Sequence, residues 1–102
     1  MVTIVLPGAY GKPRPALIIQ SELFGSLGSV TVLSVTSELR AAPLVRISVE
    51  PSTGNGLRKK SQVMVDKIQT VPRDKVGTTI GRLHQDVLVA VDRALAVFLG
   101  LA

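Results

Sequence analysis

Most of the chain consists of short apolar runs separated by turn-forming residues. The runs span residues 2–6, 16–20, 30–35, 44–49, 62–65 and 68–71, and turn signals lie at residues 7–8, 25–29, 43, 51–56 and 72. In the fourth run polar and apolar positions alternate, so one of its faces is apolar. Short strands at this spacing predict a small barrel or a strongly bent sheet, in which the last two runs form one or two strands.

The period of the pattern changes near the C-terminus. Apolar residues recur there at helical spacing, at Val87, Val91, Ala94, Leu95 and Phe98, while Gln85, Asp92 and Arg93 fall on the opposite side. This arrangement predicts an amphipathic helix of about four turns. Asp86 suits the first turn of such a helix, and Gly100 marks its end. Residues 1–102 are therefore expected to form one mainly β domain with a C-terminal helix.

Composition limits the core and the cofactors. The chain is 46% hydrophobic with three aromatic residues and no cysteine, which predicts an aliphatic core without disulfides. A single histidine does not make a zinc site, so we expect neither a metal nor another cofactor. No apolar run approaches the roughly 18 residues needed to cross a membrane, and the first residues lack the basic lead of a signal peptide. These features favour a cytoplasmic protein.

The charge of the chain is strongly basic. Twelve Lys and Arg residues against seven Asp and Glu residues give a net charge of +5, which permits binding to nucleic acid or to an acidic partner. The scarcity of aromatic residues argues against the base-stacking platforms of many single-strand binders. The short basic run at residues 58–60 is expected to be a solvated loop.

Arg14 is the most informative candidate for chemistry. It lies between Pro13 and Pro15 and leads directly into an apolar run. Each proline restricts φ, and Pro15 also favours an extended conformation at Arg14. A guanidinium presented from so stiff a backbone is suited to a phosphate. The alternative is an exposed arginine that makes at most a weak surface ion pair.

Four further residues are weaker candidates. Thr36 and Ser37 follow an apolar run, where their hydroxyls are able to donate to phosphate oxygens or, alternatively, to form a turn or cap. Asp66 interrupts an apolar pattern, either as a turn former or as a group kept for its charge. His84 has the side chain best suited to acid–base chemistry near neutral pH, but its place at the start of the helix favours a structural role.

The order and spacing of these segments resemble the MazF/PemK family of toxin endoribonucleases. The resemblance is carried by residues 12–20, 32–37, 56–71 and 80–83. It implies a small SH3-like β-barrel with a C-terminal helix, working as a homodimer. It also implies sequence-specific cleavage of single-stranded mRNA without a metal, in which the 2′-hydroxyl attacks the phosphate to leave a 2′,3′-cyclic phosphate and a 5′-hydroxyl.

The resemblance also implies roles for individual residues and a protein partner. Arg14 falls on the catalytic arginine of the family and Thr36 on its catalytic threonine. Ser37 and Asp66 fall on positions that line the RNA groove in some members. The partner implied is an antitoxin, for which a small acidic protein with an extended tail is the electrostatic expectation.

The loop before Arg14 departs from the family pattern. Many members have a longer loop there with a glutamate, whereas residues 7–13 contain no carboxylate. The acceptor of the 2′-hydroxyl proton is therefore left open, and the resemblance allows Arg14 itself to take part in the proton transfer. Tyr10 and Lys12 are the loop residues expected to occupy this space and to contact RNA.

Three other functions remain as alternatives. A family member that binds RNA or an antitoxin without cutting is one of them. A gyrase inhibitor of the CcdB type is disfavoured, because that activity depends on a Trp-Gly-Ile-like C-terminus and this chain has no tryptophan. A peptide-binding SH3-like module is disfavoured by the lack of aromatic residues.

Overall fold

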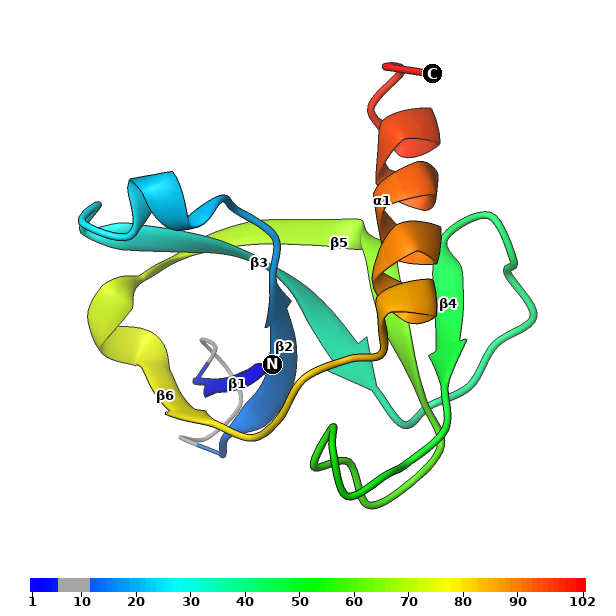
Figure 1. Cartoon of the computed structure of the whole chain (residues 1–102), viewed down its shortest axis with the longest axis horizontal. Coiled ribbons are helices and arrows are strands. Elements are labelled where there is room, and N and C mark those ends of the chain that lie inside the picture. The colour runs from blue at the N-terminus through cyan, green and yellow to red at the C-terminus, as the bar shows by residue number, and fades with distance from the viewer. Residues whose placement is uncertain (6–11) are drawn as a thin grey trace.

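A bent six-stranded sheet forms the framework of the molecule, seen in a computed structural model that describes residues 1–5 and 12–102 (Figure 1). The strands are β1 (Val2–Ile4), β2 (Arg14–Ile18), β3 (Ser29–Thr36), β4 (Arg46–Val49), β5 (Ser61–Pro72) and β6 (Val76–Thr79). The helical segments are α1 (Gln85–Phe98) and two single turns of 3₁₀ helix, η1 (Glu22–Phe24) and η2 (Arg73–Lys75). All strand pairs are antiparallel, and the order across the sheet is β4-β5-β3-β2-β1-β6.

The predicted mainly β fold with a C-terminal helix is confirmed. The runs at 62–65 and 68–71 join into the single long strand β5, whereas β6, which contains Gly77 and two threonines, was not predicted. Within the described residues the sheet bends strongly but does not close into a barrel, because β4 and β6 end the strand order without pairing to each other.

A large irregularity lies where β5 passes β3. Leu33 pairs with Ile68 and Val35 pairs with Val63, so two residues along β3 correspond to five along β5. Extra residues on one strand bend it and increase its local twist. Because β5 bends at this point (Figure 1), its two halves contact different parts of the protein.

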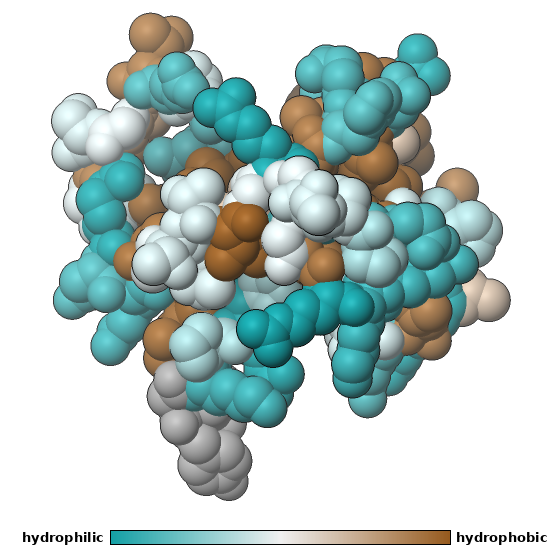
Figure 2. Space-filling view, turned by 60° about the horizontal axis from the view of Figure 1, so that its bottom comes forward, coloured by the Kyte–Doolittle hydropathy of each residue, from teal (hydrophilic) through white to brown (hydrophobic). Residues whose placement is uncertain are grey.

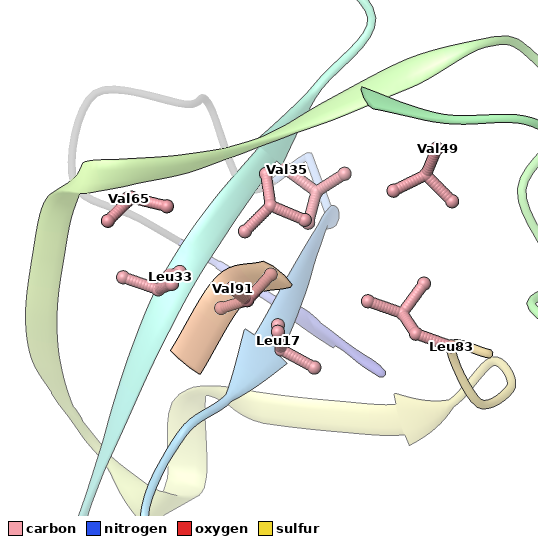
Figure 3. Packing of buried hydrophobic residues seen from close by; sticks show 8 residues of the cluster. Leu17, Leu33, Val35, Val49, Val65, Leu83 and Val91 are labelled. Carbon is pink, nitrogen blue, oxygen red and sulfur yellow. The ribbon is translucent and has the colours of Figure 1, made fainter. Parts of the chain in front are cut away.

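Each face of the sheet has its own hydrophobic core. One cluster lies beneath α1 and consists of Leu17, Leu33, Val35, Val49, Val63, Val65, Leu83 and Val91 (Figure 3). The other lies on the opposite face, where the sheet curls around Val2, Ile4, Ala16, Val30, Val32 and Val71. Since neighbouring residues of a strand point to opposite faces, β3 supplies side chains to both clusters.

Helix α1 packs on the first cluster through one face. Val91 is 1% exposed, and Val87, Ala94 and Leu95 pack around it as predicted. Phe98 does not follow the prediction, because its side chain is 47% exposed at the end of the helix that extends beyond the sheet (Figure 1).

The start of α1 explains the role of His84. This residue is the N-cap, and its Nδ1 accepts a hydrogen bond of 3.2 Å from the backbone N–H of Asp86. Such a bond satisfies one of the free N–H groups of the first helical turn. His84 therefore has the structural role that its position predicts.

The start of the chain is tied to the segment before α1. The amino group of Met1 donates to the carbonyl of Gly81, and the Met1 carbonyl accepts from the N–H of Ile80 at 2.9 Å. Burial, with a smaller repulsion from Arg82, lowers the pKa of this amino group below its ordinary value. In the described part of the chain no helix has the length and apolar character needed to span a membrane.

We expect Val91→Asp to unfold the protein. The substitution places an unpaired charge in the cluster beneath α1, at a cost of about 4 kcal/mol or more, which is most of the stability of a small domain. Thermal unfolding followed by circular dichroism should show no cooperative transition above room temperature. Val97→Asp is the matched control, since Val97 is 60% exposed on the same helix and its substitution should be tolerated. A stable Val91→Asp variant would contradict the packing of α1.

Candidate active site

An open cavity of about 640 Å³ lies where the start of β2, the end of β3 and the start of β5 meet. Its lining combines basic, hydroxyl and apolar side chains, contributed by Arg14, Pro15, Ser34, Val35, Thr36, Ser37, Glu38, Leu57, Arg58, Lys59, Ser61 and Met64. These three strand ends lie along the bottom of Figure 1. Figure 2 brings that side forward and shows a face on which hydrophilic side chains predominate, with small apolar areas between them.

The strand register brings Arg14 and Thr36 together. Ala16 pairs with Ser34 on the neighbouring strand, so continuing the register by two residues sets Arg14 across from Thr36. Residues directly opposite each other in an antiparallel pair share a face and lie about 5 Å apart at Cβ. Both side chains line the cavity, as the resemblance would require of a catalytic pair.

Arg14 is available to a ligand. It is the first residue of β2 and is exposed, and no carboxylate in the described part of the chain lies within salt-bridge distance of it. Pro15 has no N–H to donate, and the ladder between β2 and β3 begins at Ala16. The guanidinium is thus offered from the end of a strand that lies between β1 and β3 and pairs with both of them at Ala16.

The hydroxyl of Thr36 is oriented by the chain that follows it. Its Oγ1 accepts a hydrogen bond of 3.1 Å from the backbone N–H of Glu38. A threonine hydroxyl has one proton to donate and two lone pairs, so this bond uses an acceptor position and leaves the proton free. Thr36 is therefore prepared to donate to an anion in the cavity.

A compact turn precedes the residues that form the opposite wall of the cavity, which begins at Leu57. Asn55 is 5% exposed, and its Oδ1 accepts from the N–H groups of Ser52 at 3.0 Å and Leu57 at 2.9 Å. Gly56 follows with a φ of 72°, which a residue with a side chain rarely adopts. A Cβ on Gly56 would lie 2.0 Å from the carbonyl oxygen of Ile80. The turn thus sets the direction in which the chain enters the basic run.

The cavity carries a positive charge. Arg14, Arg58 and Lys59 line it, against the single carboxylate of Glu38 among the described lining residues. Cationic side chains around a concave surface concentrate the potential and attract polyanions. The run at 58–60 is exposed, as expected of a solvated loop, and two of its three residues also line the cavity.

A buried hydrogen bond supports the floor of the cavity. Ser34 is 7% exposed, and its Oγ accepts from Nε2 of Gln69 at 2.7 Å. Ser34 lies two residues before Thr36 and therefore on the same face of β3. The bond joins a residue of the cavity lining to Gln69 of β5, two residues before Val71 of the second hydrophobic cluster.

The other predicted residues do not all join the cavity. Ser37 lines the cavity, whereas Lys12 is exposed and Asp66 is half-buried, and neither is among the residues that line it. Asp66 Oδ1 is buried without a hydrogen-bond partner, and its Oδ2 lies 4.0 Å from Nζ of Lys67. Tyr10 falls outside the described residues.

Other cavity residues went unnoticed in the sequence. Nothing in the spacing of Glu38, Ser34 or Ser61 marks them, because they join the cavity only through the pairing of β2, β3 and β5. Among residues 1–5 and 12–102, no group of three or more histidine and acidic side chains is placed to hold a metal ion.

Comparison with known proteins identifies relatives along the whole chain. A family model described as the PemK-like, MazF-like toxin of type II toxin–antitoxin systems matches residues 2–99. The probable endoribonuclease MazF of Mycolicibacterium smegmatis is 48% identical over 101 residues, which are 98% of this chain and 93% of that protein.

Solved structures agree with this assignment. The toxin MazF-mt6 of Mycobacterium tuberculosis superposes with a TM-score of 0.82 at 29% identity, covering 99% of this chain and 97% of the toxin. An endoribonuclease from a mycobacterial species, solved in complex with its cognate antitoxin, shares the fold with a TM-score of 0.83 at 24% identity, over 99% and 92% of the two chains.

We expect Gly56→Ala to destabilise the protein and to displace the basic wall of the cavity. The alanine Cβ meets the Ile80 carbonyl and strains a positive φ, which together cost about 2 kcal/mol or more. Gly28→Ala is the matched control, because nothing lies within 4 Å of a Cβ at Gly28. Urea unfolding of both variants measures the difference, and equal stability would contradict the close contact at Gly56.

Proposed function

Because the chain belongs to the PemK-like, MazF-like toxin family of type II toxin–antitoxin systems, we propose that it is an endoribonuclease that cuts single-stranded RNA without a metal. The observation that carries this proposal is the placement of Arg14 across from Thr36 in a basic cavity. A cationic fork and a free hydroxyl proton, side by side and accessible, are suited to a phosphodiester.

The proposed reaction is an internal transfer at phosphorus. The 2′-oxygen forms a bond to the adjacent phosphorus as the bond from phosphorus to the 5′-oxygen breaks. The 2′-hydroxyl loses its proton to a base, and the departing 5′-oxygen gains one, which gives a 2′,3′-cyclic phosphate and a 5′-hydroxyl. No water is consumed in this step.

The cavity residues match the needs of this transition state. The Arg14 guanidinium neutralises the charge that develops on the non-bridging oxygens, and the Thr36 hydroxyl donates to one of them. Proton transfer needs an acceptor close to the 2′-hydroxyl, and Glu38 is a carboxylate that lines the same cavity. Arg58 and Lys59 on the opposite wall hold the phosphates of neighbouring nucleotides.

The proposed partner is an antitoxin that covers the basic cavity, with the toxin acting as a homodimer. An acidic segment complements a cavity in which three cationic side chains face one carboxylate. The cognate antitoxin present with the mycobacterial endoribonuclease of the same fold supports a partner of this kind. Ser37, Lys12, Asp66 and Tyr10 remain proposed RNA contacts.

We expect Arg14→Ala to abolish RNA cleavage without affecting the fold. The exposed side chain contributes charge to the reaction and little to the core, so the loss should be at least about 100-fold in rate. The measurement is cleavage of a long single-stranded RNA in the presence of EDTA, with the ends analysed for cyclic phosphate. Thr36→Val, which removes the hydroxyl at similar volume, should also lower the rate.

The control for this experiment is Arg93→Ala, which removes an exposed arginine from α1, away from the cavity. Parent-like cutting by Arg14→Ala would remove Arg14 from the reaction. A folded parent that does not cut would favour a family member that binds RNA or an antitoxin without cleavage.

We expect the double variant Arg58→Gln and Lys59→Gln to weaken RNA binding mainly at low salt. Each cation that contacts a phosphate of single-stranded RNA adds about 0.7 to the slope of log affinity against log salt, so the slope should fall by about 1.4. The pair Lys75→Gln and Arg93→Gln is the control with the same net charge outside the cavity. An equal change in slope in both double variants would mean that net charge, not the cavity wall, decides binding.

A further inference from the structure

Gln62 is a buried polar residue next to the catalytic pair. It lies near the start of β5, is 7% exposed, and pairs with Thr36 of β3 on one side and Ser48 of β4 on the other. Arg14, Thr36 and Gln62 therefore follow one another across one face of three adjacent strands. A buried amide is costly unless its donor and acceptor are both satisfied.

The Gln62 side chain pairs with the backbone of Arg40. Its Oε1 accepts from the Arg40 N–H at 3.0 Å, and its Nε2 donates to the Arg40 carbonyl at 3.1 Å. The two bonds join one side-chain amide to both polar groups of one residue, as a neighbouring strand would. They hold a segment that no helix or strand supports, since residues 37–45 lie between β3 and β4.

Arg46 extends this connection toward the cavity. Its Nη1 donates to the Glu38 carbonyl at 3.0 Å and to Gln62 Oε1 at 3.2 Å. One guanidinium nitrogen carries two hydrogens, so it is able to serve both oxygens at once. Gln62 and Arg46 thus form one unit, which we call the Gln62–Arg46 clamp.

The clamp ends at the hydroxyl of Thr36. The carbonyl of Glu38 is held by Arg46, and the N–H of Glu38 donates to Thr36 Oγ1. Movement of the Glu38 backbone would release that acceptor position and let the Thr36 hydroxyl rotate. Catalytic groups lose up to about 100-fold in rate when their geometry shifts by about 1 Å.

We propose that Gln62 and Arg46 are positioning residues that aim the Thr36 hydroxyl through the backbone of Glu38 and Arg40. This inference rests on the proposed ribonuclease function. It assigns a reaction role to two residues that do not line the cavity. It also explains why a glutamine is buried at a strand position between Thr36 and Ser48, where an apolar residue would otherwise be expected.

The experiment compares Gln62→Leu with Gln20→Leu. Gln20 also uses its Oε1 to accept from a backbone N–H, that of Thr31 at 2.8 Å, but lies outside the cavity and pairs with no cavity residue. The substrate is a labelled single-stranded RNA oligonucleotide containing a site mapped with the parent protein. We expect Gln62→Leu to lower kcat about 10- to 100-fold with KM nearly unchanged, and Gln20→Leu to alter neither.

A second readout follows the clamp itself. Amide hydrogen exchange measured by NMR should accelerate at Arg40 in Gln62→Leu, while the amides of α1 keep their parent rates. Gln62→Glu keeps the acceptor for the Arg40 N–H and for Arg46, so it should retain more activity than Gln62→Leu. A loss of kcat that Gln62→Glu does not relieve, with uniformly faster exchange, would indicate general destabilisation and overturn the inference.

Arg46→Lys provides a test that does not depend on a buried substitution. Arg46 is half-exposed, and lysine keeps its charge without placing two hydrogens on one planar nitrogen. We expect the same selective loss of kcat. A parent-like kcat in folded Gln62→Leu and Arg46→Lys would overturn the inference but leave the proposed nuclease function intact. A folded parent protein that does not cut RNA would instead overturn the proposed function, and with it the role of the clamp in catalysis.

Discussion

Strand β3 is hydrogen-bonded along both edges and covered on both faces. It pairs with β2 and β5, and its alternate residues enter the two hydrophobic clusters, Leu33 and Val35 beneath α1 and Val30 and Val32 on the opposite face. A strand held in this way has little freedom to shift, because a slip of one residue would exchange its two faces. The position of Thr36 at its end is therefore set by the packing of the whole domain.

The bend of β5 divides the face that carries Thr36 into two parts. On one side of the bend, Val71 packs with Val30 in the second cluster, and on the other side Gln62 and Met64 lie beside the cavity. The hydrogen bond from Gln69 to Ser34 lies between these parts. A single sheet face thus provides both a closed core and an open, polar site, since the bulge lets β5 change direction between them.

The polar groups around the cavity divide into exposed cations and buried amides. Arg14, Arg58 and Lys59 face the cavity and remain free to meet an anion. Gln62 and Asn55 are buried, and their amides hold the two segments that border the site. Buried hydrogen bonds in a medium of low polarity are strong and directional, which suits them to holding backbone in place.

The sequence by itself determined the strands β1 to β5, the amphipathic helix with its capping residue, and the stiff presentation of Arg14, because each depends on neighbours in the chain. The resemblance carried by a few segments also pointed to the family that the comparisons show. The open sheet, the weak strand β6 and the exposed Phe98 followed from how the elements pack, which local patterns do not contain. Only the tertiary structure brought Arg58, Lys59 and Glu38 to Arg14 and connected Gln62 to Thr36, since these residues lie far apart in the chain and meet through strand register.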